Sequence, residues 1–207
     1  MRDCEPIASL SPESAAPSGW ILPVNRRIAL IFRGLAEVER GNHPKALAAF
    51  RVAEDEMQAQ PVHLDWYWRL ALEWGMVTLL IATGDHAGAL ARAEGLCALA
   101  EQTDERAWQA LAYEGQARAA LARGDVPKAI DYVGKASAAC AGVQIPSVEL
   151  RVVATGATAF RAAGDAARAT QHICRGEIIR KQLAESLPED HSLRQQFERR
   201  SATLLAG

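Results

Sequence analysis

The residues Arg123, Gly124 and Asp125 spell a tripeptide by which adhesion receptors recognise their ligands, and they are the most obvious binding motif in the chain. The segment that contains them, "RGDVPKAI", is however one of four related segments, the others being "RGNHPKAL", "TGDHAGAL" and "AGDAARAT". Their glycines are spaced by 43, 40 and 40 residues. A receptor ligand has no reason to recur at a fixed period, whereas the turn of a repeated unit must recur. We therefore interpret residues 123–125 as a turn between two helices.

Histidine and cysteine side chains could supply catalytic or metal-binding groups, but their spacing argues against both. No C-x-x-C pair and no short His/Cys spacing occurs, which argues against a zinc site. We expect three of the four cysteines (Cys4, Cys97, Cys140 and Cys174) to be small apolar residues on helices, kept reduced. No phosphate-binding loop and no hydrolase motif occurs. The sequence predicts a protein that is not an enzyme and has no cofactor or metal, with an enzyme of unrecognised type as an open alternative.

The four repeated turns can be explained from their own residues. Glycine adopts the left-handed backbone conformation that ends a helix at no steric cost. The residue after each glycine carries a side-chain oxygen that can cap the first N–H groups of the next helix. The four turn glycines are Gly41, Gly84, Gly124 and Gly164, and the four capping residues are Asn42, Asp85, Asp125 and Asp165. The chain is therefore expected to run helix, turn, helix four times.

The predicted fold class is all-α, because alanine and leucine dominate and alternating β-branched stretches are missing. Helices are predicted over 24–40, 43–58, 64–83, 86–101, 104–123, 126–141, 147–163 and 166–186, with a ninth over 189–205. Residues 1–23 are rich in serine and proline and are predicted to form a flexible lead-in. One helical-repeat domain is expected over 24–207, with repeats over 24–60, 64–101, 104–142 and 147–186 and a capping helix over 189–205.

Charge and hydropathy exclude several classes of partner. The net charge of -2 gives no electrostatic basis for binding nucleic acid or a membrane surface. The first twenty residues lack the apolar segment of a signal peptide. The longest apolar run, "MVTLLIA", is far shorter than the ~20 residues that cross a bilayer. We expect a soluble, cytoplasmic protein that binds neither nucleic acid nor a membrane.

The packing positions of the repeats carry a family resemblance. Gly34, Gly41, Ala46, Phe50 and Ala53, with weaker sets around the later turn glycines, form a pattern that resembles tetratricopeptide repeats. The resemblance implies antiparallel helix pairs stacked into a right-handed superhelix with a concave groove. The period of 40 is longer than the family's usual 34. It resembles the C-terminal arrays of bacterial signalling ATPases and LuxR-type regulators, to whose closing segment the tail "IIRKQLAESLPEDHSLRQQFERRS" is also similar. HEAT-like stacking is the competing fold.

The resemblance also implies where a partner would bind, because ligands of such repeats lie along the first helix of each pair. From these positions we predict a groove set of Trp74, Thr78, Glu114, Arg118, Arg151, Thr158 and Arg161. The arginines could hold an acidic peptide or a C-terminal carboxylate through forked hydrogen bonds. The alternative is an ordinary solvated face with ion pairs such as Glu114 with Arg118 at i, i+4.

The densest aromatic stretch, "DWYWRLALEW" at residues 65–74, allows two interpretations. Tryptophan, tyrosine and arginine dominate binding hot spots, so the stretch could be an interface. It could equally pack one repeat against the next, because Trp66, Leu70, Trp74 and Val77 follow a helical step. We expect most of these rings in the core and one of them, Trp68 or Trp74, partly exposed.

The expected function is non-catalytic. The pattern favours a protein- or peptide-binding scaffold, a regulatory or adaptor module in bacterial signalling that binds through the concave face. The first alternative is the C-terminal, ligand-sensing portion of a larger ATPase or transcriptional regulator. The partner is expected to be a protein or peptide, acidic if the groove arginines bind it, and a homodimer stays open.

Overall fold

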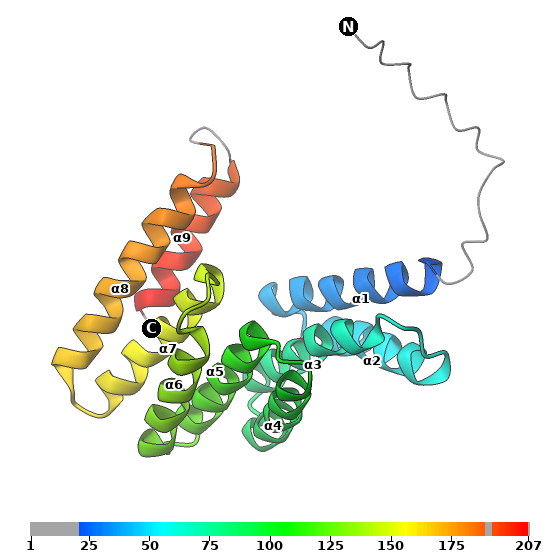
Figure 1. Cartoon of the computed structure of the whole chain (residues 1–207), viewed down its shortest axis with the longest axis horizontal. Helices are drawn as coiled ribbons and strands as arrows, with labels where there is room; N and C mark the ends of the chain where they lie inside the picture. Colours follow the sequence, from blue (N-terminus) through cyan, green and yellow to red (C-terminus); the bar gives the residue numbers. More distant parts are fainter. Residues whose placement is uncertain (1–20, 189–191, 207) are drawn as a thin grey trace, which may run out of the picture.

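A computed structural model describes residues 21–188 and 192–206, and in this part of the chain every regular element is an α-helix (Figure 1). The helices are α1 (Ile21–Glu39), α2 (His43–Ala59), α3 (Asp65–Ala82), α4 (His86–Gln102), α5 (Arg106–Ala122), α6 (Val126–Cys140), α7 (Pro146–Ala162), α8 (Ala166–Glu185) and α9 (Ser192–Ala206). The all-α prediction is confirmed, and each predicted helix is present with ends shifted by a few residues. Two boundaries are corrected: α1 begins at Ile21, inside the predicted lead-in, and α9 begins at Ser192. The rest of the lead-in and residues 189–191 lie outside the described residues.

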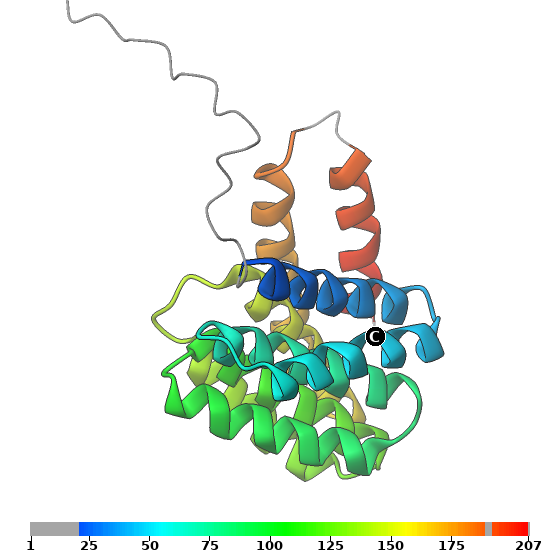
Figure 2. The ribbon, with the colours of Figure 1, turned by 90° about the vertical axis from the view of Figure 1, so that its right-hand side faces the viewer.

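The helices pack as consecutive antiparallel pairs that follow one another through the molecule (Figures 1 and 2). Each helix contacts the next in sequence, and each odd-numbered helix also contacts the next odd-numbered one, from α1 with α3 to α7 with α9. No even-numbered helix contacts another even-numbered helix in the described residues. The odd helices therefore form one continuous inner layer, and the even helices cover it as an outer layer. This is a repeat-like arrangement in which each unit buries its apolar side against its neighbours.

The glycine turns have the predicted conformation. Gly41, Gly84, Gly124 and Gly164 all have φ between 75° and 83°, in the left-handed region. The three aspartates that follow the later glycines cap the next helix, accepting hydrogen bonds from the backbone N–H groups of Gly88, Lys128 and Arg168. The first turn departs from the prediction, because Asn42 makes no side-chain cap and its amide instead donates to Glu37 at 2.7 Å.

Gly124→Val is expected to lower the free energy of unfolding by about 1–2 kcal/mol, because a side chain disfavours the left-handed region and a β-branched one does so most. A Cβ at Gly124 would meet no atom within 4 Å, so the loss would come from the backbone conformation alone. Urea unfolding measures it. Gly134→Val, in the open interior of α6 at an ordinary φ, is the control for steric and surface effects. An equal loss of unfolding free energy in Gly124→Val and Gly134→Val would contradict the attribution of the effect to the left-handed conformation of Gly124.

In the first repeat, the aromatic ring of Phe50 packs between two glycines, Gly34 and Gly75. Phe50 on α2 is fully buried, and a Cβ added at Gly34 or Gly75 would lie 2.4 Å or 2.6 Å from its ring. Gly34 is on α1 and Gly75 on α3, so the ring fills the space where the first two odd helices meet α2. Gly34, which belongs to the repeat pattern in the sequence, is therefore required here because a side chain would collide with the Phe50 ring.

A buried ion pair, which was not predicted from the sequence, joins α1 to the end of α2 and the start of α3. Arg27 is 1% exposed and donates from Nη1 to both carboxylate oxygens of Asp65, at 2.7 Å and 2.6 Å. Its Nη2 donates to the backbone carbonyls of Glu56 and Gln60, and Asp65 also accepts from the N–H of Val62. One arginine thus satisfies the end of α2 and the start of α3 together.

The last helix covers the end of the odd layer. Leu205 of α9 is buried with Leu150 and Val153 of α7 and Ile179 of α8. Gly176 on α8 leaves room for it, since a Cβ there would lie 2.3 Å from the Leu205 side chain. In Figure 2, α8 and α9 run side by side and project beyond the other pairs. α9 therefore packs Leu205 against apolar side chains of both α7 and α8.

None of the helices in the described ranges combines the length and apolar character that crossing a bilayer requires.

Candidate functional site

A pocket of about 380 Å³ lies in the inner layer and is formed only by odd-numbered helices. We call it the central pocket. Its lining residues are Glu39, Thr78, Glu114, Arg118, Leu121, Arg151, Ala154, Thr155, Thr158, Thr203 and Leu204. Five helices converge there, from α1 to α9, so residues more than 160 positions apart in sequence share one site. A pocket of this size suits a small ligand or a short segment of a partner chain.

The central pocket brings together most of the residues predicted for the groove. Five of the seven predicted residues line it: Thr78, Glu114, Arg118, Arg151 and Thr158. Trp74 is half-buried and touches the pocket through its contact with Arg151. Arg161 is not brought to it, because it is exposed in the last turn of α7.

Arg151 is the arginine of the central pocket that has no acidic partner in the described residues. Its guanidinium carbon lies 5.0 Å from the centre of the Trp74 ring, which orients the cation by a cation–π contact from α7 to α3. Its Nε is buried and donates to no acceptor in the described residues, and no carboxylate within them lies at ion-pair distance. A fixed guanidinium without an acidic partner is the group that a carboxylate ligand requires.

Glu114 is the buried negative group of the central pocket and is 2% exposed. Its Oε1 accepts a hydrogen bond from Thr155 at 2.9 Å, and Arg118 Nε lies 3.8 Å from the same oxygen. Its Oε2 is buried and accepts nothing from the described residues. A buried carboxylate normally has its charge compensated by partners on both oxygens, so Glu114 is only partly satisfied. The i, i+4 pair predicted between Glu114 and Arg118 is present, but it is long.

The threonine hydroxyls that line the pocket can accept hydrogen bonds from a ligand, because their protons are already donated within the protein. Thr78, Thr158 and Thr203 each donate their single hydroxyl proton to a carbonyl one turn earlier on their own helix. Thr155 donates to Glu114. A hydroxyl has one proton and two lone pairs, so the oxygens that remain can accept hydrogen bonds from a ligand.

The C-terminal helix closes one side of the central pocket, which sequence reasoning did not foresee. Thr203 and Leu204 of α9 line it, and Arg200 lies 3.5 Å from Glu39 at the end of α1. This ion pair joins the first and last helices of the described chain. Both side chains are more than half exposed, so the ion pair contributes little to stability, but it shows that α9 lies close to the end of α1.

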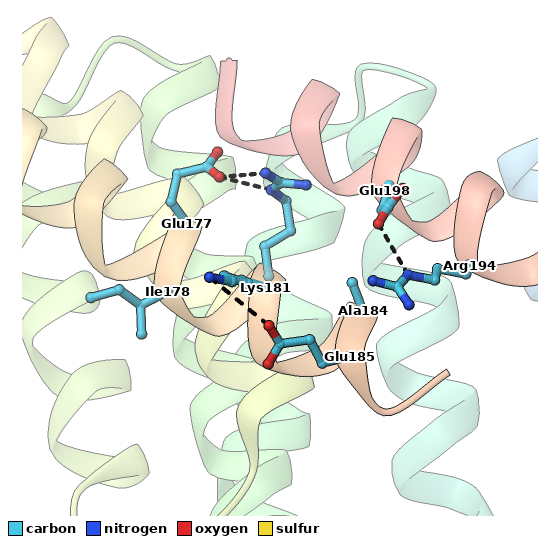
Figure 3. Close-up of a pocket in the computed structure, with 8 residues that line it drawn as sticks. Glu177, Ile178, Lys181, Ala184, Glu185, Arg194 and Glu198 are labelled. Atoms are coloured by element: carbon cyan, nitrogen blue, oxygen red, sulfur yellow. Dashed lines mark hydrogen bonds and ion pairs between the residues drawn. The ribbon is translucent and has the colours of Figure 1, made fainter. Parts of the chain in front are cut away.

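A second pocket, between α8 and α9, makes a useful contrast (Figure 3). Its charged side chains pair with one another: Glu177 with Arg180, Lys181 with Glu185 and Arg194 with Glu198. Figure 3 shows these pairs arranged along the two helices around Ala184. Since each charge already has a local partner, this pocket has the character of a solvated surface, whereas the central pocket holds groups that lack partners.

The aromatic stretch is less buried than predicted. Trp68 and Trp74 are half-buried, as expected for one of them, but Trp66 and Tyr67 are 40% and 36% exposed. The helical step therefore does not bring Trp66 into the core. Tyr67 makes edge contacts with Trp66, Trp68 and Trp108, at centroid distances of 5.3–6.5 Å.

The three cysteines in the described residues, Cys97, Cys140 and Cys174, are free thiols, and Cys4 lies outside those residues. Cys97 and Cys140 are buried, and burial raises the pKa of Cys140 to about 11, so its thiol stays protonated at neutral pH. Cys174 is exposed on α8 and not apolar core as expected, because its helix turns this face outward. In the described ranges no three His, Cys, Asp or Glu residues gather closely enough to hold a metal ion.

Comparison with known proteins leaves the geometry as the basis for any functional argument. No protein-family model matches the sequence, and a search of curated proteins found no significant relative.

Proposed function

We propose that the protein is a non-catalytic scaffold that binds a segment of a protein partner in the central pocket and along the odd helices beside it. In this proposal the helix pairs form a right-handed, tetratricopeptide-like superhelix, and the odd layer is its concave face. The role is that of an adaptor or regulatory module in bacterial signalling. The observation that carries the proposal is Arg151, held on Trp74 and lacking a carboxylate partner in the described part of the chain.

The partner segment is proposed to carry an acidic group for Arg151. A guanidinium that is already oriented loses little side-chain entropy on binding a carboxylate, so it can contribute more than an exposed lysine or arginine could. The pocket's threonine oxygens and Leu121 would contact the rest of the segment. This mixture of apolar, hydroxyl and charged lining would allow the site to select a ligand by its hydrogen-bonding groups.

The proposal is tested by placing a photo-crosslinking residue in the central pocket in cells of the source organism. Thr158→p-benzoylphenylalanine sits in the pocket, and Gly134→p-benzoylphenylalanine, exposed on the outer layer with open space around it, is the matched control. We expect a protein adduct at position 158 that is lost when Arg151→Ala is added, and no such adduct at position 134. Equal adducts at both positions, or none at position 158, would contradict a partner-binding role for the pocket.

A further inference from the structure

The central pocket holds a carboxylate with one oxygen that accepts no hydrogen bond and a guanidinium without an acidic partner, and this combination restricts the ligand. Glu114 Oε2 and Arg151 Nε are both buried, and both lack a hydrogen-bond partner in the described residues. Thr155, which donates to Glu114, is one helical turn after Arg151 on the same face of α7. Through Thr155, Glu114 of α5 therefore contacts the turn of α7 that follows Arg151.

Charge excludes the simpler ligands. A divalent cation or a polyamine would meet Arg118 and Arg151, and like charges in a buried site repel strongly. A phosphate or another purely anionic group would meet Glu114, whose carboxylate is 2% exposed and cannot be screened by solvent. A ligand that carries an ammonium group and a carboxylate on adjacent atoms satisfies both groups at once.

We infer that the central pocket binds a free α-amino acid, with its ammonium group on Glu114 and its carboxylate on Arg151. Arg118, whose side chain is 29% exposed and whose Nε is 3.8 Å from Glu114, is loosely held and can move aside as the ammonium group approaches. The acceptor oxygens of Thr78 and Thr158 would take further protons of that ammonium group. The pocket volume of about 380 Å³ leaves room for a side chain beside Leu121.

The inference rests on the proposed function in one respect, which is that the central pocket is a binding surface. A bound amino acid would occupy the place of the partner's acidic group. It would therefore compete with the partner, and the amount of partner bound would fall as the concentration of the amino acid rises.

The test measures binding of the standard L-amino acids, one at a time at millimolar concentration, by thermal shift and then by calorimetry on the full chain. We expect at least one to bind. Its Nα-acetyl derivative lacks the ammonium group and its amide lacks the carboxylate, so each should bind at least about tenfold more weakly. Because these comparisons use the wild-type chain, they do not depend on any variant folding. Glu114→Gln, which keeps the shape and the bond from Thr155, and Arg151→Ala should show the same loss, while Arg161→Ala should bind as wild type.

Two results would overturn the inference. If no amino acid shifts the melting temperature, the pocket does not take this ligand. If the Nα-acetyl derivative binds as tightly as the free amino acid, the pocket selects the carboxylate alone, as the last residue of a peptide would present it. Neither result bears on the crosslink at position 158, so failure of this inference is distinguishable from failure of the scaffold proposal.

Discussion

Arg27→Ala is expected to lower the free energy of unfolding by about 3–5 kcal/mol, the range seen when one partner of a buried ion pair is removed. The substitution leaves the carboxylate of Asp65, whose side chain is 12% exposed, with only the Val62 N–H as partner. It also removes the donors for the Glu56 and Gln60 carbonyls. Urea denaturation followed by circular dichroism measures the loss.

Two companion variants show whether the loss comes from the buried pair. Arg27→Met with Asp65→Leu removes both charges and keeps apolar volume, so it should be more stable than Arg27→Ala. Arg26→Ala removes the neighbouring arginine, which is 68% exposed and pairs with Glu56 at the surface, and should cost little. Equal stability of Arg27→Ala and Arg26→Ala would contradict the assigned role of Arg27.

Phe50→Ala is expected to lower the free energy of unfolding by a similar amount, about 3–5 kcal/mol, because a fully buried ring leaves a cavity that rigid helices cannot close. The contact with Gly75 allows a sharper test. Gly75→Ala alone should cost about 1–3 kcal/mol, since its methyl group would lie 2.6 Å from the Phe50 ring. In the Phe50→Ala background the same methyl group should cost nothing or stabilise, because it partly fills the cavity.

Gly134→Ala is the control for this cycle. Gly134 lies inside α6 with open space around its Cβ position, so alanine there should stabilise the helix by about 0.5–1 kcal/mol. Additive effects of Phe50→Ala and Gly75→Ala in thermal or urea unfolding would show that the ring and the glycine do not contact each other.

Local chemistry determines what could be predicted from the sequence. The turn glycines require a left-handed residue and the aspartates after them have an oxygen for the next helix, so helix order and ends followed from short segments. Asn42 is the exception, because its amide reaches Glu37 five residues earlier, and that choice depends on tertiary context. The Arg27–Asp65 pair was missed because its members are separated by 38 residues and each, read alone, is an ordinary surface charge.

The candidate site was predictable to the extent that it follows the repeat. Thr78, Arg118 and Thr158 occupy equivalent places on successive odd helices, so one periodic rule finds them. The α9 residues Thr203 and Leu204 obey no such rule, since their presence depends on how the last helix folds back over the layer. The lack of a partner on Glu114 Oε2 is likewise visible only when all five helices are in place.

The binding role of the central pocket is tested most directly by measuring the dissociation constant of the crosslinked partner, or of its crosslinked segment, for the purified chain and two arginine variants. Arg151→Ala removes the oriented guanidinium, and Arg161→Ala removes an exposed arginine of the same helix outside the pocket. We predict that Arg151→Ala weakens binding at least about tenfold, as expected for a lost hydrogen bond between charged groups, and that Arg161→Ala does not weaken it. Equal affinity of the wild type and Arg151→Ala for the partner would contradict the proposal that the partner binds in the central pocket through Arg151.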